Sequence, residues 1–180
     1  MDFVESRIFA IACPSVSDLR LLLTVSDLSI IIFLSLIFPS LGLTVVGIDP
    51  CPQDRQHNSI VSMHPKFSHL RMRLSGVKRS QLPPKVEWLL CDANISPHSA
   101  LSHLSDLVCA LSVNDQGFCG MFLTAKLGDT AEPIPEILQR VRDIGKGVFT
   151  SIGATHLPSN GQEILVVALT EKGVARRQQR

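Results

Sequence analysis

The pattern of apolar and polar positions predicts a succession of strands and helices from residue 43 onward. Apolar runs of about four to eight residues, bounded by turn-forming residues, are typical of strands buried in a sheet. The alternating run His-Leu-Arg-Met-Arg-Leu at 69–74 predicts a strand with one exposed face, at an edge of the sheet. The predicted strands cover residues 43–48, 69–74, 85–91, 118–124, 148–154 and 163–169.

Two further segments have apolar residues every three or four positions, which is the spacing of an amphipathic helix. The first is predicted to run from Pro97 to about Val113, with Ser96 as its N-cap. The second is predicted to begin at Pro135 and to end near Gly145. Strands that alternate with helices and close with a hairpin predict an α/β fold. Its sheet would be mostly parallel, with helices on its faces and one antiparallel strand at its end.

Residues 28–48 form an uncharged apolar stretch about as long as a membrane-spanning helix. Pro39 and Gly42 interrupt this stretch, and its β-branched end at 44–48 is typical of a core strand. We therefore expect a buried element up to Phe38 and then a strand, although periodicity alone leaves a membrane helix as the alternative. The composition divides the chain into a divergent apolar segment (1–42), one domain (43–172) and a disordered basic tail (173–180).

The composition also restricts the class of protein. A length of 180 residues suffices for one domain with a core, and 45% hydrophobic against 18% charged residues suits a globular α/β protein. The five cysteines form no CxxC pair, which is typical of reduced, buried thiols inside the cell, and we expect a cytoplasmic or organellar location. None lies at ligand spacing from a histidine, so no metal site is expected. The cysteines are Cys13, Cys51, Cys91, Cys109 and Cys119.

Three polar residues mark the edges of apolar runs. Asp92 ends the run that begins at Val86, Lys126 ends the run that begins at Phe118, and Glu163 begins the run 163–169. In open α/β sheets, ligands bind where strands end and the chain leaves the sheet. We expect these side chains to converge on one crevice, where an ammonium and two carboxylates could orient a hydroxyl group and take up its proton.

Four motifs, in this order along the chain, carry a resemblance to a known family. They are Gly-Ile-Asp-Pro at 47–50, Val-Glu-Trp-Leu-Leu-Cys-Asp at 86–92, Phe-Leu-Thr-Ala-Lys-Leu at 122–127 and His-Leu-Pro-Ser-Asn-Gly-Gln-Glu-Ile-Leu-Val-Val-Ala at 156–168. This order resembles the FtsJ-like RNA ribose 2′-O-methyltransferases, most closely the RlmM-type branch that acts on ribosomal RNA. The resemblance implies a Rossmann-like methyltransferase sheet, S-adenosylmethionine as cofactor, ribosomal RNA as substrate, and a monomer without metal or membrane anchor.

The family has a Lys-Asp-Lys-Glu catalytic set, and the resemblance transfers three of its members. Asp92 matches the aspartate, which also lies against the cofactor, Lys126 matches the second lysine, and Glu163 matches the glutamate. Asp49 matches the acidic residue that binds the ribose hydroxyls of the cofactor, and a carboxylate at a strand end suits that role. Lys126, with a pKa lowered by burial, would accept the proton of the RNA hydroxyl.

The chain departs from the family in its first part. No lysine precedes Lys66, so the first catalytic lysine has no counterpart ahead of the first strand. The family's glycine-rich loop, whose backbone N–H groups approach the cofactor, is also missing, since no glycine precedes Gly42. The alternative is therefore a catalytically inactive or truncated methyltransferase-like protein.

Each candidate residue also has an ordinary structural explanation. Asp49 before Pro50 suits a strand-ending turn, and Asp92 suits a cap of the turn that follows it. Lys126 could be a solvated charge, and Glu163 follows an Asn-Gly pair typical of hairpin turns.

A cluster of basic residues has two explanations. The net charge of +1 gives no whole-protein attraction to a polyanion, so binding to nucleic acid would need a local patch. One such cluster could contact phosphates, or it could be the solvated face of an edge strand. It consists of Arg71, Arg73, Lys78, Arg79 and Lys85.

Overall fold

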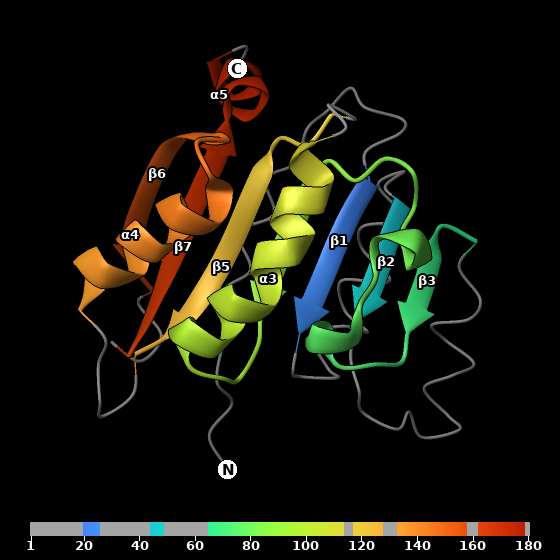
Figure 1. The fold of residues 1–180 in the computed structure, drawn as a ribbon, viewed down its shortest axis with the longest axis horizontal. Helices are drawn as coiled ribbons and strands as arrows, with labels where there is room; N and C mark the ends of the chain where they lie inside the picture. The colour runs from blue at the N-terminus through green and yellow to red at the C-terminus, as the bar shows by residue number, and fades with distance from the viewer. Residues whose placement is uncertain are drawn as a thin grey trace.

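A computed structural model describes residues 20–25, 44–48, 65–113, 117–127, 133–157 and 162–178. Within them lies a seven-stranded sheet of order β3-β2-β1-β4-β5-β7-β6 (Figure 1). The strands are β1 (Arg20–Val25), β2 (Thr44–Ile48), β3 (Phe67–Leu70), β4 (Trp88–Asp92), β5 (Gly120–Lys126), β6 (Phe149–His156) and β7 (Glu163–Thr170). Strands β1 to β5 pair in parallel, and β7 pairs antiparallel with both β5 and β6. The predicted α/β fold and mostly parallel sheet are confirmed.

The last strand along the chain, β7, is antiparallel to both of its neighbours, as predicted, but its place in the sheet differs from the expected end position. Strand β7 lies between β5 and β6, so β6 and not β7 forms the edge of the sheet. The reason is the apolar content of the two strands, because six consecutive residues of β7 are apolar (Ile-Leu-Val-Val-Ala-Leu), whereas β6 reads Phe-Thr-Ser-Ile-Gly-Ala-Thr-His. An interior strand is covered on more sides than an edge strand, so the more apolar partner of the hairpin takes the interior position.

Strand β3 occupies the other edge of the sheet, as its alternating sequence predicted. It ends at Leu70, however, and the predicted strand extension to Leu74 is wrong. The chain instead turns into two short 3-10 helices, η1 (Leu74–Gly76) and η2 (Arg79–Gln81). Alternation of exposed and half-buried residues continues through this segment without sheet pairing.

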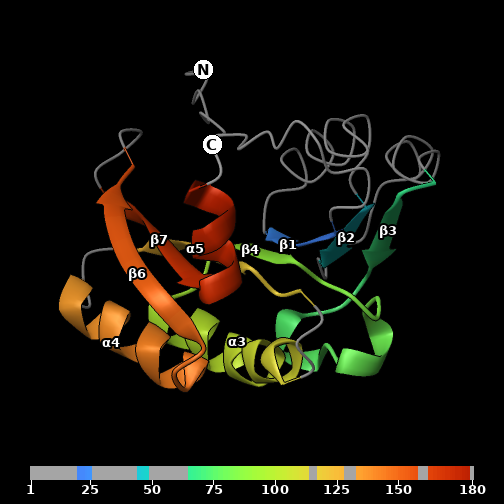
Figure 2. The same ribbon diagram turned by 90° about the horizontal axis from the view of Figure 1, so that it is seen from above.

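The two predicted helices are confirmed. Helix α3 (Pro97–Ser112) starts at its proline, and the Ser96 hydroxyl accepts a hydrogen bond from the Ser99 amide at 3.2 Å, which satisfies one of the first-turn donors. Helix α4 (Ile134–Gly145) begins one residue earlier than predicted. Figure 2 shows both helices on the same side of the sheet.

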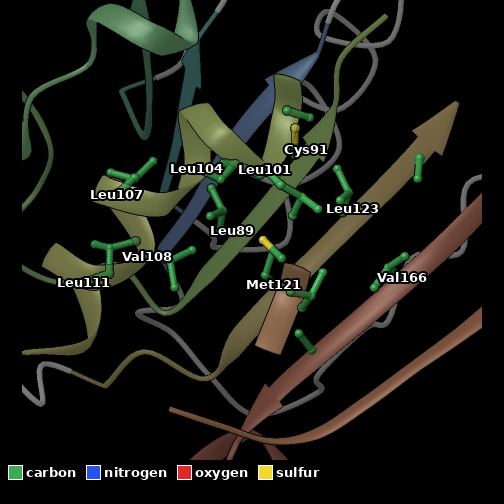
Figure 3. Packing of buried hydrophobic residues seen from close by; sticks show 14 of the residues in the cluster. Leu89, Cys91, Leu101, Leu104, Leu107, Val108, Leu111, Met121, Leu123 and Val166 are labelled. Atoms are coloured by element: carbon green, nitrogen blue, oxygen red, sulfur yellow. The ribbon is translucent and has the colours of Figure 1, made fainter. Parts of the chain in front are cut away.

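The core lies between these helices and the sheet. Alternate residues of β4 and β5 point toward α3 and are fully buried, among them Leu89, Cys91, Met121 and Leu123 (Figure 3). Since successive residues of a strand face opposite ways, the intervening residues lie on the other face of the sheet. Asp92 and Lys126, the last residues of β4 and β5, are among the residues on that other face.

The C-terminal region differs from the expected disordered tail. Residues through Gln178 form helix α5 (Glu171–Gln178), which follows β7 at the end of the sheet where the parallel strands begin (Figure 1). Two interactions hold the helix there: Gly173 packs against the backbone of Cys119, and Arg176 pairs with Glu87. The sheet also includes β1, which pairs with β2 and β4, so it extends into the segment 1–42.

Candidate functional site

The carboxyl ends of the five parallel strands meet at one edge of the sheet, the lower edge in Figure 1. The strand order reverses at β1, which has β2 on one side and β4 on the other. In open α/β sheets this switch point, beyond the carboxyl ends, is where ligands bind. Asp92, the last residue of β4, lies at this point and pairs in register with Val25 of β1.

Lys126 and Glu163 are brought to the same edge by the antiparallel pairing of β5 and β7. Lys126 is the last residue of β5, Glu163 is the first residue of β7, and the two are direct register partners. The side chains of directly opposed residues lie on the same face of a sheet. Asp92 on the neighbouring strand β4 faces the same way, since the residues before it and before Lys126, Cys91 and Ala125, are both buried on the α3 side.

The three predicted side chains meet in one ion cluster, which we call the Asp92–Lys126–Glu163 triad. The Lys126 Nζ atom lies 2.9 Å from Asp92 Oδ1 and 2.6 Å from Glu163 Oε1. The side chains keep 25%, 30% and 19% exposure for Lys126, Asp92 and Glu163 respectively, so the cluster is shielded yet reachable from solvent. The structure thus brings these three residues, which are distant in sequence, into contact at one edge of the sheet, as expected.

The electrostatics of the triad correct one expectation. Burial lowers the pKa of the Lys126 ammonium, but the hydrogen bonds and charges of Glu163 and Asp92 outweigh burial and raise the pKa above its ordinary value of 10.5. Lys126 is therefore a cation at neutral pH, and a lysine that already holds its proton cannot accept one from a substrate. The condition for proton uptake by Lys126, a pKa lowered by burial, is therefore not met, and the sequence does not show that two carboxylates flank the same ammonium.

The arrangement suits the orientation of a hydroxyl group. An ammonium has three N–H donors; one of those in Lys126 donates to Glu163, and a second can serve the Asp92 carboxylate 2.9 Å away. The third can donate to a substrate oxygen, while the carboxylates accept a proton from the same group. With two carboxylates and one ammonium, the triad has a formal charge of −1, so it also complements a cationic ligand placed beside it.

Some predicted features fall outside the described residues. Asp49, the expected ribose-binding carboxylate, follows the last described residue of β2, and most of the stretch 28–48 is likewise not covered. Cys91, Cys109 and Cys119 are free thiols, the first and last of them buried. Among the helices that are described, none combines the length and apolar character needed to cross a bilayer. The described His, Cys, Asp and Glu residues include no group of three placed to hold a metal ion.

A second cluster of charges, at the opposite end of the sheet, was not predicted. Glu87 is only 1% exposed and its Oε1 atom lies 2.6 Å from Arg176 Nη2 and 3.3 Å from Lys85 Nζ. Beside it, the Thr170 hydroxyl donates to the carbonyl groups of Phe118 and Cys119 at 2.9 and 3.2 Å. The sequence signal was a single acidic residue inside an apolar run, Val86-Glu87-Trp88, because a buried carboxylate needs a charged partner.

Comparison with known proteins supports the fold but not a family. No protein-family model matches the sequence, and no curated protein matches it. Among solved structures, Aeropyrum pernix fibrillarin with natively bound S-adenosyl-L-methionine is similar at 15% identity, with a TM-score of 0.63 over 88% of this chain and 69% of that chain. The fibrillarin pre-rRNA processing protein of Methanococcus jannaschii gives a TM-score of 0.58 at 13% identity over the same shares, 88% and 69%.

A methyltransferase named for a small-molecule substrate is similar to a comparable degree. The Burkholderia thailandensis 1,6-didemethyltoxoflavin-N1-methyltransferase, with S-adenosylhomocysteine bound, has a TM-score of 0.57 at 14% identity over 84% of this chain and 70% of that chain. The fold is the Rossmann-like methyltransferase fold. Identities this low establish the architecture alone, because one architecture supports many activities.

Proposed function

We propose that this protein is an S-adenosylmethionine-dependent RNA ribose 2′-O-methyltransferase, with ribosomal RNA as its substrate. The observation that carries the proposal is the Asp92–Lys126–Glu163 triad, in which one ammonium lies within 3 Å of two carboxylates at the carboxyl edge of the sheet. A hydroxyl is a weak nucleophile, and a site that alkylates one must orient it and receive its proton. The similarity to fibrillarins, one of which is described as a pre-rRNA processing protein, supports RNA as the substrate.

The charge of the Asp92–Lys126–Glu163 triad suits the end of the cofactor that bears the methyl group. S-adenosylmethionine, when bound, supplies a methyl group on a positively charged sulfur. The net negative triad complements such a charge, and Asp92 lies at the switch point where the fold binds ligands. Asp49 would accept the ribose hydroxyls of the cofactor, by its place directly after β2.

The residues of the chain then have separate roles in the reaction. Lys126 uses its free N–H to hold the 2′-oxygen of the RNA, leaving a lone pair on that oxygen for attack. The proton of the hydroxyl passes to a carboxylate oxygen of Asp92 or Glu163 and from there to solvent. Lys126 remains protonated throughout. Burial lowers its pKa, but the two flanking carboxylates raise the pKa by more, so the net shift is upward. Its positive charge also stabilises negative charge that develops on the 2′-oxygen.

Methyl transfer to ribosomal RNA tests the proposal. Purified protein is incubated with RNA and tritiated S-adenosylmethionine, and 2′-O-methylation is recognised by the resistance of the modified linkage to alkali. We expect Lys126→Ala to lower the rate by roughly two to four orders of magnitude, because a positioned charged group in a shielded site contributes that much. Lys146→Ala, an exposed lysine in the turn after α4, serves as the matched control and should leave the rate unchanged. Incorporation that Lys126→Ala does not reduce would refute the role of the triad.

One observation favours a second candidate, an inactive methyltransferase-like protein. Between the end of β1 at Val25 and the start of β2 at Thr44 the chain contains a single glycine, Gly42. Glycine is the residue that lets backbone N–H groups approach a bound ligand closely. Calorimetric titration with S-adenosylmethionine separates the candidates: the active enzyme requires saturable binding, and its absence would favour the inactive protein.

A further inference from the structure

One segment of the chain concentrates positive charge. Residues 65–85 contain six of the 17 Lys and Arg residues and none of the 16 Asp and Glu residues. The segment comprises β3, the turn after it and the two 3-10 helices that lead to β4. A segment without acidic residues has no internal counter-charge, so the fold decides which of its cations are neutralised by other parts of the protein.

Four of these six cations fall into two groups in the structure. Arg79 Nη1 donates to the carbonyl groups of Leu82 and Pro83 at 3.4 and 2.7 Å, and its Nη2 donates to Pro84, so this guanidinium fixes the turn before β4. Lys85 pairs with buried Glu87. The side chains of Arg71 and Arg73, by contrast, are exposed and form no ion pair with any described residue.

Arg71 and Arg73 lie at the same edge of the sheet as the triad. Arg71 directly follows Leu70, the last residue of β3, and β3 belongs to the parallel set whose carboxyl ends include Asp92. Figure 1 shows the chain leaving β3 along the lower edge of the sheet toward β1. Three strand spacings of about 4.8 Å separate β3 from β4, so the carboxyl ends of these two strands are about 14 Å apart across the edge.

Arg71 and Arg73 belong to a segment that packs against the hydrophobic core. Met72 and Leu74, which alternate with them, are half-buried and pack against the hydrophobic core. The Met72 amide also donates to the Leu70 carbonyl at 2.9 Å. Alternation of this kind directs both guanidinium groups to solvent from a fixed backbone, which reduces the entropy lost when they bind a ligand.

The charge of the triad explains why such a segment is needed. Asp92, Lys126 and Glu163 together carry a formal charge of −1, so the reaction site itself does not attract a polyanion. A net protein charge of +1 gives no general attraction either. Affinity for a phosphate backbone must therefore come from cations near the site, and guanidinium groups bind phosphate oxygens through two parallel hydrogen bonds.

We propose that Arg71 and Arg73 form an arginine strip that binds the phosphate backbone of the substrate RNA beside the reaction site. The inference rests on the proposed function, since it assumes that the triad receives a ribose. A single-stranded segment whose ribose lies at Lys126 would run along the carboxyl edge, outside the bound cofactor, and place phosphates a few nucleotides away on the strip. Such interactions position the RNA without reading its sequence.

Binding of RNA, measured apart from methyl transfer, tests the arginine strip. The probe is a fluorescein-labelled single-stranded oligoribonucleotide of mixed sequence, and its affinity is measured by fluorescence anisotropy over a series of salt concentrations. The variant is Arg71→Gln/Arg73→Gln, the rescue variant is Arg71→Lys/Arg73→Lys, and the matched control is Arg177→Gln, an exposed arginine on α5 at the other end of the sheet. Circular dichroism and thermal unfolding confirm that each protein is folded.

We expect the glutamine variant to bind the RNA roughly ten- to a hundredfold more weakly than the wild type, since it removes two cations that would contact phosphate groups. The slope of log K against log salt should become shallower by about 1.4, or about 0.7 for each phosphate that an arginine no longer neutralises. The lysine variant should retain the salt slope, and Arg177→Gln should bind like the wild type.

Three results would overturn the arginine strip. One is wild-type affinity in the glutamine variant, and another is no RNA binding by the folded wild type. The third is equally tight, arginine-dependent binding to phosphatidylserine vesicles, which would assign the surface to a membrane. None of these decides the proposed function, because titration with S-adenosylmethionine and the Lys126→Ala comparison measure the triad separately. Conversely, suppose that the protein binds RNA through the strip but transfers no methyl group. That result would support the arginine strip and refute the proposed methyltransferase activity.

Discussion

The ion pair between buried Glu87 and half-buried Arg176 makes the C-terminal helix part of the fold, and removing one partner tests this directly. The change is Arg176→Met, which keeps an unbranched apolar side chain and removes the guanidinium 2.6 Å from Glu87 Oε1. The Glu87 carboxylate has 1% exposure, so water has little access to replace the guanidinium that is removed. The variant therefore leaves the buried charge of Glu87 with Lys85 as a remaining ion-pair partner among the described residues.

The expected loss of stability follows from the geometry of the remaining partner. Breaking a buried ion pair by removing one member costs about 3–5 kcal/mol when nothing replaces it. Lys85 still lies 3.3 Å from Glu87, but it is 45% exposed and its attraction is weakened by solvent. We therefore expect a decrease of about 2 kcal/mol in the free energy of unfolding, which for a chain of this length lowers Tm by about 4–8 °C.

Urea unfolding followed by circular dichroism measures the decrease, with Arg177→Met as the matched control. Arg177 is exposed on the same helix, so its replacement should change the stability by no more than about 0.5 kcal/mol. Adding Glu87→Gln completes a double-mutant cycle, in which we expect a coupling of at least about 1 kcal/mol between Glu87 and Arg176. Equal effects of the Arg176 and Arg177 replacements, together with a coupling near zero, would refute the conclusion that this pair anchors α5.

Three further predictions concern the triad and two local interactions. Because the pKa of Lys126 is raised above 10.5, its ion pairs should stabilise the fold fully from about neutral pH up to about pH 10.5 and lose that effect as the pH rises through the raised value. A stability gap to Lys126→Met that narrows already between about pH 7 and 9 would contradict this. Gly173→Ala should destabilise by about 2–3 kcal/mol in thermal unfolding, since its Cβ would lie 2.0 Å from the Cys119 carbonyl oxygen, whereas Lys172→Ala on the exposed side should not. Ser96→Ala should cost about 1 kcal/mol in urea unfolding because the cap of α3 is removed, and Ser96→Asp should retain most of the stability.

Local sequence patterns identified most of the elements but not their ends. The strand around Leu89 and the helix after Ser96 were predicted because their apolar residues recur with the period of one kind of secondary structure. The alternation through Arg71 and Arg73 extended a predicted strand too far, because the pattern persists after sheet pairing ends at Leu70. Exposed and half-buried residues alternate in any extended chain that packs on one side, so the pattern does not mark where hydrogen bonding to a neighbouring strand stops.

Helix α5 was missed for a related reason. Its sequence, Glu-Lys-Gly-Val-Ala-Arg-Arg-Gln, is short and polar, and an isolated helix of that length is not stable in water. Its stability comes from partners distant in sequence: Glu87, which pairs with Arg176, and Cys119, against whose backbone Gly173 packs. Nothing within the last residues of the chain indicates either interaction.

The sequence by itself determined the alternation of strands and helices, the mostly parallel sheet, and the placement of Asp92, Lys126 and Glu163 at strand ends. These follow from local periodicity and from the rule that parallel strands share one carboxyl edge. Only the tertiary structure decided that β7 inserts beside β5, which makes Lys126 and Glu163 register partners, and that two carboxylates flank one ammonium. The charge state of that ammonium depends on distances between side chains from three strands, and such distances are set by packing and register, which local sequence patterns do not encode.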